Sequence, residues 1–311
     1  MALRPGRERG VLSALERPAV LAVSGGADSM LMAAALHAAD PSQVLALATF
    51  DHGTGAAAAA AVEAVRAWGS SRGIRVHVGQ ARDLPRTEAA WRSARWTFLR
   101  ELAAEHDAPV ATAHTEDDQA ETVFMRLLRG SGVRGLAGLL APSTVLRPLL
   151  HLTRVEVRAL AVRAEVPFIN DPSNADLRHL RNRVRLELLP ALERVTPGFR
   201  AWLLRVGREA AAWRADVARA ADLHWRPAVE SERGIARVPR DRRRLPTADE
   251  AALFWPEVAG RLGIPLDRRG TARLASFTTK LETGLQMPLS GGVRVTSDRD
   301  GWSMERAGAG G

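Results

Sequence analysis

Cysteine is absent from this sequence of 311 residues. Its absence excludes mechanisms that need a thiolate nucleophile, a disulfide relay or a cysteine-held metal cluster, and it fits a reducing compartment. Long apolar runs are absent too, because none approaches the roughly 20 residues that a membrane-spanning helix needs. Residues 1–10 are basic, but no apolar segment follows them, so a secretory signal is not expected. These absences predict a cytoplasmic protein without a membrane partner.

Lysine is almost absent as well, since Lys280 is the single lysine among 44 Lys and Arg residues. These residues outnumber 35 Asp and Glu residues, which gives a formal net charge of +9 and a pI near 11.3. A GC-rich coding bias explains the preference for arginine over lysine but not the excess of positive charge. Polyanion binding is the usual reason for such an excess, because each neutralised phosphate releases counterions. The composition therefore favours a nucleic-acid partner.

The hydrophobic pattern changes in character near residues 190–198. Before this point, short β-branched or apolar runs alternate with helical stretches rich in Ala, Leu and Arg. Predicted strands cover 18–23, 44–50, 75–80 and 109–113, and predicted helices cover 28–39, 56–72 and 87–106. The alternation predicts an α/β fold, a Rossmann-like parallel sheet with helices on both faces. We expect it to form a first domain over residues 1–198.

Residues 199–311 are expected to form a helical linker and a small α+β C-terminal domain. A helix is predicted from the residues after Pro197 to about Leu223, followed by a loop rich in Arg and Pro over 233–246 and a helix over 248–262. Residues 286–289 and 292–296 are predicted to pair as a hairpin. The Ala-Gly run at the end is expected to be disordered.

The first chemical signal is a Ser-Gly-Gly-Ala-Asp-Ser segment between the first predicted strand and helix. Gly25 and Gly26 let the backbone bend sharply and bring N–H groups close to an anion, which the following helix N-terminus also favours. Ser24 and Ser29 add hydroxyl donors. Asp28 repels a phosphate unless Mg²⁺ lies between them; the alternative is a strand-to-helix turn in which Asp28 caps the helix. No lysine lies nearby, which favours a pyrophosphate leaving group over γ-phosphoryl transfer.

The second signal follows the fourth predicted strand, where His114 precedes a helix that begins near Thr115. Asp118 and Glu121 lie three residues apart and therefore share one face of this helix. Two carboxylates and an imidazole at the carboxyl end of a parallel strand lie where open α/β sheets bind ligands. Taken alone, the segment is equally compatible with a capping box of Thr115 and Asp118 and a solvated acidic turn. Its combination with the Ser-Gly-Gly turn favours a catalytic site.

The Ser-Gly-Gly-x-Asp-Ser segment resembles the signature of N-type ATP pyrophosphatases, which implies an adenine nucleotide alpha hydrolase-like fold. Enzymes of that family adenylate a carbonyl oxygen, release pyrophosphate and let a nucleophile displace AMP. The second segment is similar to that of tRNA(Ile)-lysidine synthetases, where it leads to an Arg-Gly-x-Gly loop. Further family motifs, within roughly residues 18–198, are Arg129-Gly130-Ser131-Gly132, Arg147-Pro148-Leu149-Leu150, Arg154, Glu156, Asn170-Asp171-Pro172-Ser173-Asn174, Arg181-Asn182-Arg183-Val184-Arg185 and Leu189-Pro190. The tail is similar to the small domain that follows in the family, which implies tRNA binding by that domain, and the last domain of longer members is expected to be missing.

This resemblance implies an enzyme that joins L-lysine to carbon 2 of the first anticodon cytidine of tRNA(Ile) with a CAU anticodon, using ATP and Mg²⁺. The implied roles are nucleotide binding by Ser24, Gly25, Gly26, Asp28, Ser29 and Arg95, metal binding by Asp28 and Asp118, substrate binding by Glu121, Arg181, Asn182 and Arg185, and catalysis by Asp28, His114, Asp118, Glu121 and Arg185. His114, with an ordinary pKa near neutrality, is expected to polarise the cytosine or to shuttle a proton. A solvated arginine-rich helix face is the alternative for residues 181–185. The oligomeric state is left open and is compatible with a homodimer.

The chain departs from the family pattern at two places. The family has His-x-Asp-His-Gly-Leu-Arg after the second strand, whereas this chain has Thr49-Phe50-Asp51-His52-Gly53-Thr54-Gly55. The first His and the Arg are missing, together with any substrate contact that they make. The family's Arg-Tyr pair appears as Arg95-Trp96, which keeps an aromatic ring but loses a hydroxyl.

Two other classes of function remain open. One is a different ATP pyrophosphatase, such as a tRNA thiolase or an amidating enzyme, although the absence of cysteine argues against sulfur transfer and no glutaminase segment is visible. The other is a non-catalytic RNA-binding module, in which the acidic positions are dispensable. Arg242, Arg243 and Arg244 are expected to form a solvated loop that contacts RNA loosely. Six tryptophans are assigned to packing, namely Trp91, Trp96, Trp202, Trp213, Trp225 and Trp255.

Overall fold

The computed structural model describes residues 15–53, 55–81, 87–230, 233–241, 245–280 and 282–306. The Arg242–Arg244 loop and the terminal Ala-Gly run lie outside these ranges. The chain divides into two compact units, Met1–Ala210 and Ala211–Gly311. This boundary falls inside the long helix α10 (Phe199–Trp225), whereas the sequence places it where that helix begins. None of the helices in the described ranges is both long and apolar enough to cross a bilayer.

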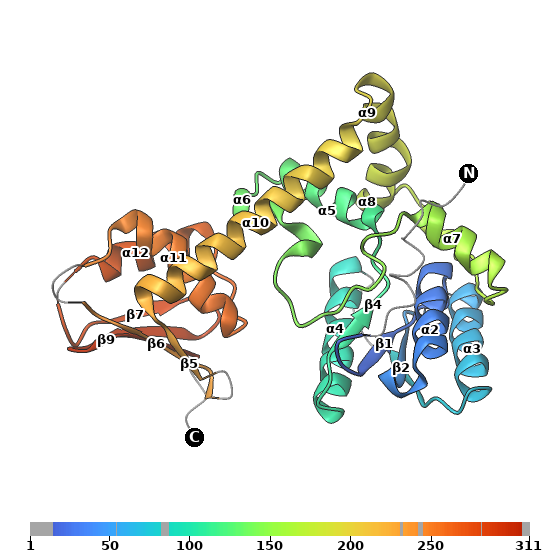
Figure 1. Ribbon diagram of the computed structural model, residues 1–311, viewed down its shortest axis with the longest axis horizontal. Coiled ribbons are helices and arrows are strands. Elements are labelled where there is room, and N and C mark those ends of the chain that lie inside the picture. Colours follow the sequence, from blue (N-terminus) through green and yellow to red (C-terminus); the bar gives the residue numbers. More distant parts are fainter. Residues whose placement is uncertain are drawn as a thin grey trace. The chain divides into compact units, whose positions relative to one another are not determined.

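A four-stranded parallel sheet forms the centre of the first unit (Figure 1). Its strands are β1 (Ala19–Ala22), β2 (Val44–Asp51), β3 (Val76–Gln80) and β4 (Val110–Thr112), in the spatial order β3-β2-β1-β4. The chain crosses from β3 to the far side of β1 to form β4, so the strand order reverses between β1 and β4. The carboxyl ends of these two neighbouring strands are therefore the place where such a sheet binds ligands.

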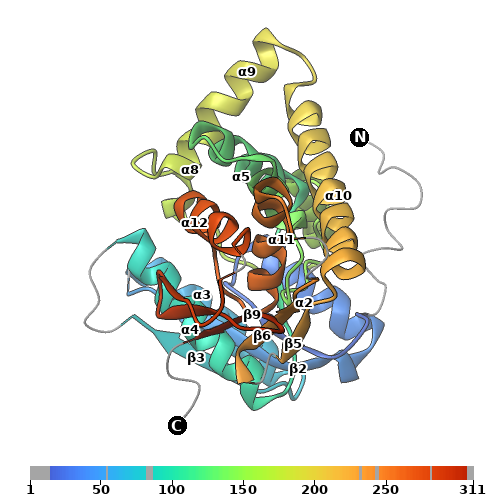
Figure 2. The same cartoon turned by 90° about the vertical axis from the view of Figure 1, so that its left-hand side faces the viewer.

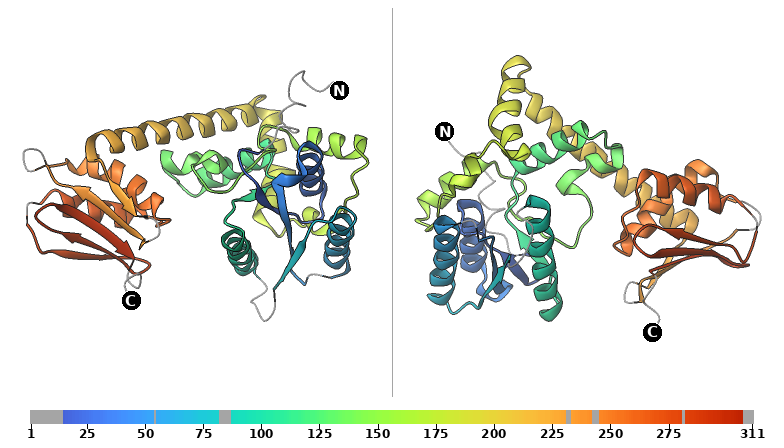
Figure 3. Two further views of the ribbon diagram at one scale, coloured as in Figure 1. Left: turned by 60° about the horizontal axis from the view of Figure 1, so that its bottom comes forward. Right: turned by 180° about the vertical axis from the view of Figure 1, so that it is seen from behind.

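Helices cover both faces of this sheet, because alternate residues of a strand point to opposite sides. Ala19 and Leu21 pack with α2 (Ala27–Ala39), α3 (Ala56–Ser70) and α7 (Arg154–Arg163). Val20 instead packs with Leu99 and Leu102 of α4 (Glu88–Glu105). Figures 1 and 3 show α2 and α3 on one side of the strands and α4 on the other. The predicted fold class is confirmed, and the predicted bounds of these strands and of α2, α3 and α4 agree to within two residues.

Short helical elements carry the later motifs of the first unit. They are the helices α5 (Glu116–Leu128), α6 (Val133–Leu136), α8 (Leu180–Arg183) and α9 (Leu189–Val195), a π-helical turn (Val184–Leu188), and the 3-10 turns Pro41–Gln43, Gly138–Leu140 and Pro172–Ala175. Ala120 and Val123 of α5 pack against Leu203 of α10. This packing fixes the helix that carries Asp118 and Glu121.

The second unit is a five-stranded antiparallel sheet with α11 (Ala248–Arg261) and α12 (Arg268–Thr278) on one face (Figure 2). Its strands are β5 (Ala228–Glu230), β6 (Ile235–Pro239), β7 (Gln286–Leu289), β8 (Val293–Ser297) and β9 (Gly301–Arg306), in the order β5-β6-β9-β8-β7. The predicted hairpin is β7 and β8, and the predicted α+β character is confirmed. The prediction of a loop over 233–246 is wrong, because β6 lies within it. Ala236 and Val238 point into the core there, an alternation that the surrounding Arg and Pro residues obscure.

The tryptophans are mostly packed, as expected. Trp225 and Trp255 are buried in the core of the second unit, and Trp213 packs against it. Trp96 packs against the α4 side of the first sheet. Trp202 is 39% exposed, with its ring centroid 5.4 Å from that of Phe199, and Trp91 lies 5.8 Å from the ring of His52.

Candidate active site

The Ser24–Ser29 turn follows β1 and leads into α2. Ser29 Oγ accepts the Ser24 N–H and donates to the Gly26 carbonyl oxygen, each at 3.0 Å, and the two hydroxyls lie 3.1 Å apart. Gly25 has a φ of +80°, and a Cβ at this position would lie 2.8 Å from the Ala61 carbonyl oxygen of α3. Glycine is therefore required both by the backbone conformation and by the close approach of α3.

The same turn has the properties of a phosphate cradle. Gly26 is the N-cap of α2 and offers no side-chain cap, and the N–H groups at a helix N-terminus favour an anion. The Gly25 carbonyl oxygen accepts the Ile169 N–H at 2.9 Å, which brings the segment after α7 beside the turn. The residues present therefore fit the phosphates of a nucleotide.

The helix α5 begins with a capping box. Thr115 donates to Asp118 Oδ2 through its N–H (2.8 Å) and its hydroxyl (2.9 Å), and the Asp118 N–H is directed back to Thr115 Oγ1. The capping interpretation of this segment is therefore correct, but it uses only one oxygen of Asp118. The other oxygen faces the neighbouring arginines, so the same carboxylate both starts the helix and lines the site.

Two arginines connect the carboxylates of the site. Arg154, the first residue of α7, lies 3.0 Å from Asp118 Oδ1 and 3.1 Å from Glu121 Oε1, and its Nε lies 4.0 Å from Asp28 Oδ2. Arg181 of α8 reaches the same α5 carboxylates, at 2.9 Å from Asp118 Oδ1 and 2.7 Å from Glu121 Oε2. The structure thus brings Asp28, from the turn after β1, together with Asp118 and Glu121 around one guanidinium.

The pKa values of Asp28 and Asp118 are shifted in opposite directions. Burial raises the pKa of Asp28 from 3.8 to about 6; Arg154 opposes this rise, while the like charge of Asp118 adds to it. Burial also acts to raise the pKa of Asp118, but the guanidinium groups of Arg181 and Arg154 and the Thr115 N–H outweigh it and hold this pKa below its ordinary value. Asp118 is therefore ionised at neutral pH, whereas Asp28 titrates close to it.

His114 follows β4, and its Nδ1 lies 2.8 Å from Thr112 Oγ1. Burial lowers its pKa to about 4; Asp118 opposes this, and the positive charges of Arg181, Arg147 and Arg95 contribute to the decrease. The ordinary pKa on which the expected proton-shuttle role of His114 was based therefore does not hold here, because the imidazole is buried among arginines. A neutral imidazole still offers one donor and one acceptor nitrogen to a bound base.

The remaining predicted residues lie around this centre. Arg95 of α4 is close enough to lower the pKa of His114. Arg185 lies in the π-helical turn and donates to Asn182 Oδ1 at 3.0 Å, and Asn182 donates to the Asp176 carbonyl oxygen at 2.9 Å. Burial, and then repulsion by Arg154, lower the pKa of Arg185. Arg181 is bonded to α5, so it is not directed to solvent as a simple surface arginine would be.

From the sequence, Arg154 was identified only as part of a family motif, and its position between the carboxylates of the site was not predicted. The Thr153–Glu156 capping box fixes the beginning of α7 there, and the Arg154 N–H donates to Asp117 Oδ2 at 2.7 Å. Asp117, which also pairs with Arg200, was likewise not predicted. The signal that points to such residues is the acidic cluster itself, because buried carboxylates need cations.

Gln119 was also missed, and its role is structural. It is 2% exposed, donates to the Ala137 carbonyl oxygen at 3.0 Å and accepts the Leu139 N–H at 2.6 Å. A Cβ at Gly138 or Gly207 would lie within 2.5 Å of its amide group. Gln119 therefore ties the segment after the Arg-Gly-x-Gly loop to α5 and α10.

The side chains of the site can be compared with the ligands expected for Mg²⁺. Over the residues that the structure describes, no group of three or more His, Cys, Asp or Glu side chains is arranged to hold a metal ion. Asp118 uses one oxygen for its cap and the other for two guanidinium groups. Asp28 fits a cation better, because burial raises its pKa more than Arg154 lowers it, so a cation there would stabilise the ionised form. One carboxylate with phosphate oxygens is a common magnesium ligand set.

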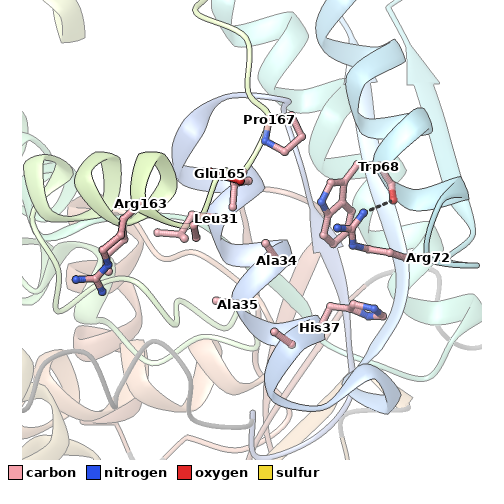
Figure 4. Close-up of a pocket in the computed structure, with 13 residues that line it drawn as sticks. Leu31, Ala34, Ala35, His37, Trp68, Arg72, Arg163, Glu165 and Pro167 are labelled. Carbon is pink, nitrogen blue, oxygen red and sulfur yellow. Dashed lines mark hydrogen bonds between the residues drawn. The ribbon is translucent and has the colours of Figure 1, made fainter.

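A pocket of about 480 Å³ lies elsewhere, between α2, α3 and the end of α7 (Figure 4). It is lined mainly by apolar side chains such as Leu31 and Trp68, and the guanidinium of Arg72 lies 4.3 Å from the Trp68 ring centroid. No predicted site residue lines it. The candidate site is therefore defined by converging charges and a glycine turn rather than by the size of a cavity.

The parallel sheet, the Ser-Gly-Gly turn after β1 and the acidic helix after β4 define a nucleotide-binding α/β protein of the PP-loop class. Residues 9–192 match the family model described as a PP-loop domain. The solved U34-tRNA thiolase NcsA from Methanococcus maripaludis, with its [4Fe-4S] cluster, has a TM-score of 0.54 and 20% identity, covering 66% of this chain and 78% of that chain. This likeness shows the fold.

Similarity to curated relatives indicates the family within the PP-loop class. The tRNA(Ile)-lysidine synthase of Salinispora arenicola is 41% identical over 210 residues, 63% of this chain and 62% of the relative. That of Bordetella pertussis is 40% identical over 219 residues, 64% of this chain and 68% of the relative. The chain belongs to the tRNA(Ile)-lysidine synthase family. It spans about three fifths of the length of the first relatives.

Proposed function

We propose that this protein uses ATP to join L-lysine to carbon 2 of the first anticodon cytidine of tRNA(Ile) with a CAU anticodon, with release of AMP and pyrophosphate, in the cytoplasm. Membership of the family supports ATP-dependent tRNA modification. The observation that carries the proposal is the convergence of Asp28, beside the Ser-Gly-Gly turn, with Asp118 and Glu121 on Arg154. A phosphate cradle beside a cation-binding face meets both needs of the reaction, which are ATP activation and selection of a cationic amino acid.

In the first step, the oxygen on cytosine carbon 2 attacks the α-phosphate of ATP and pyrophosphate leaves, which gives an adenylated cytidine. The Ser24–Ser29 turn binds the phosphates through its N–H and hydroxyl groups, and Arg95, which lies near His114, adds positive charge. Asp28 would hold Mg²⁺ there, and the ion would neutralise charge on the phosphates. Neutral His114 hydrogen-bonds the base. Since a cytosine oxygen is a weak nucleophile, positioning and electrostatic stabilisation contribute most of the rate.

In the second step, the bound side-chain ammonium of lysine loses a proton to solvent, and the resulting amine bonds to carbon 2. The bond between carbon 2 and the adenylate oxygen breaks as AMP leaves. Asp118 and Glu121 select the lysine by its positive charge, which requires that Arg154 and Arg181 first release them. Arg181, Asn182 and Arg185 then face the anionic RNA. The exchange keeps the charges paired. Each carboxylate loses a guanidinium partner and gains an ammonium partner, and the released guanidinium pairs with a phosphate of the RNA.

The proposal is tested by incubating the protein with ATP, labelled lysine and a tRNA(Ile) carrying a CAU anticodon. Label is expected in the RNA only when all three are present. Incorporation of ammonia or serine in place of lysine would identify a different member of the class. RNA that is bound but never labelled would leave only the binding-module alternative.

The site is tested by Asp28→Ala, Asp118→Ala and Glu121→Ala, each expected to abolish ATP consumption that depends on tRNA and lysine. Glu187→Ala is the matched control, because Glu187 is about half exposed and, among the described residues, its ion pair is with Arg183, at 3.8 Å. Substituted proteins that fold and still consume ATP in the complete mixture would rule out this site.

A further inference from the structure

The pocket of about 480 Å³ between α2, α3 and the end of α7 lies outside the candidate active site (Figure 4). Helix α2 lines it with Leu31, Ala34, Ala35 and Ala38, which share one helix face because they are spaced three or four residues apart. Since three of these four side chains are only methyl groups, this face leaves a hollow beside the apolar core. The volume lies within the range of about 300–1,000 Å³ that is typical of small-molecule sites.

A positively charged group lines the α3 side of this pocket. The guanidinium of Arg72 lies 4.3 Å from the Trp68 ring centroid, and its Nη1 donates to Ser71 Oγ at 2.9 Å and to the Trp68 carbonyl oxygen at 3.4 Å. These contacts hold the guanidinium but do not neutralise it, because no carboxylate in the described ranges pairs with Arg72. Its Nε and Nη2 make no hydrogen bond to a described residue, so their N–H groups remain available to an anion.

The other charged residues that line the pocket cancel each other. Arg163 and Glu165, one of each sign, lie at and just after the end of α7, and Figure 4 shows both away from Arg72 and Trp68. His37 lies beside Trp68, with the two ring centroids 6.0 Å apart, and adds a polar ring on the α3 side. The pocket therefore has an apolar middle and an uncompensated positive charge at one side.

We propose that this pocket binds a small apolar molecule that carries one anionic group. The anionic group pairs with Arg72, whose planar fork of N–H groups matches a carboxylate or a sulfonate, and the apolar body packs on the alanine face of α2. A ligand of this kind complements both the positive side of the pocket and its apolar hollow. The proposal is independent of the proposed function, because no residue assigned to the nucleotide, the lysine or the RNA lines this pocket.

The test uses the fluorescent anion anilinonaphthalene sulfonate as the probe, and phenylnaphthylamine, which has the same rings without the sulfonate, as its uncharged counterpart. The unsubstituted protein is expected to bind the anion at one saturable site from which ATP does not displace it. Arg72→Met is expected to weaken binding of the anion about tenfold, because a hydrogen-bonded ion pair is lost, and to change binding of the uncharged probe by less than about twofold. Ala34→Leu, which fills the pocket, is expected to weaken binding of both probes.

Arg66→Met is the matched control for the loss of charge. Arg66 lies on α3, its side chain is 52% exposed, and it pairs with Glu63 at 3.6 Å outside the pocket. Its substitution is expected to leave the affinity for both probes unchanged. Equal weakening of the anion by Arg66→Met and Arg72→Met would show an effect of overall charge and overturn the proposal.

Three further results would also overturn the proposal. Displacement of the anion by ATP would assign its binding to the nucleotide cradle. Equal weakening of both probes by Arg72→Met would show that the guanidinium does not pair with the anion. The absence of saturable binding would show that the pocket is closed in solution, or filled by another part of the chain or by a second copy. If Ala34→Leu does not fold, Ala38→Leu, on the same face of α2, is measured in its place.

Discussion

The acidic face of α5 and the basic face of α12 are built on opposite rules. Glu121 is 1% exposed and bonded to both Arg154 and Arg181. In contrast, Arg268, Arg269 and Arg273 of α12 are exposed, and no carboxylate in the described part of the chain pairs with them. A buried charge without a partner is costly, so the chain supplies its own cations to α5. An exposed charge is solvated and screened, so it can remain unpaired until a partner arrives.

This difference in burial and pairing indicates where a substitution affects the fold and where it affects only binding. At α5 each charge supports its neighbours, and removal of one leaves others buried and unpaired. Under the proposed function, Arg154 and Arg181 also occupy the place that a cationic substrate would take. The same type of substitution, made once at a buried charge and once at an exposed charge, therefore tests this difference.

The largest expected effect is that of Glu121→Gln. It leaves two partly buried guanidinium groups each short of an anionic partner, which is expected to lower the free energy of unfolding by about 3–5 kcal/mol. Urea unfolding followed by circular dichroism measures the change. Glu187→Gln, the same substitution in an exposed pair, is expected to cost less than about 0.5 kcal/mol. Equal costs at the two positions would break the comparison.

The next effect is that of Gln119→Met, which keeps the volume but removes the hydrogen bonds to Ala137 and Leu139. It is expected to lower the free energy of unfolding by about 1–3 kcal/mol, because the two backbone groups lose their partner. Hydrogen exchange of the Leu139 amide is expected to accelerate more than that of amides in β2. Unchanged protection at Leu139 would show that another contact holds this segment.

A smaller effect of opposite sign is expected for Asp28→Asn. An acid whose pKa is raised on folding loses stability as the pH rises from 3.8 to about 6. The shift corresponds to about 3 kcal/mol at most, and the 31% exposure of the side chain reduces this to about 1–2 kcal/mol. The variant is therefore expected to be more stable than the unsubstituted protein at neutral pH and inactive with ATP.

The pH dependence provides the control for Asp28→Asn. Its stability advantage is expected to shrink as the pH falls below about 6 and to vanish well below 3.8, where the carboxyl is protonated in both the folded and the unfolded state. Thermal unfolding of both proteins across this range measures it. An advantage that does not depend on pH would contradict the raised pKa of Asp28.

The smallest effect is expected for Arg205→Ala, which removes an exposed ion pair on α10. Its cost is expected to be at most about 0.5 kcal/mol, because exposed pairs of this spacing are solvated and screened. Chemical unfolding at low and high salt measures the cost and its expected decrease with salt. A cost comparable to that of Glu121→Gln would remove the distinction between the two regions.

The first sheet, its helices and the glycine turn could be predicted from the sequence, because these depend on short-range patterns. The hydrophobic spacing that predicts strands and helices is a local pattern. At position 25 a glycine is needed because the backbone has a φ of +80° and lies close to another chain segment. The same local reasoning found Asp28, Asp118 and Glu121 as a candidate set. It did not find β5, β9 or α12, since short strands and a helix rich in arginine carry too few apolar residues for a clear period.

Only the tertiary structure decided which charges meet. Arg154 and Arg181 are far from Glu121 in the sequence, and no local pattern indicates that both reach it at 3.1 and 2.7 Å. The shifts of Asp28 toward neutrality and of His114 away from it follow from burial and from these neighbours, which are properties of the assembled site. The physical reason is that electrostatic energies depend on distance and solvent exposure in three dimensions, whereas residue type and spacing give only the charges.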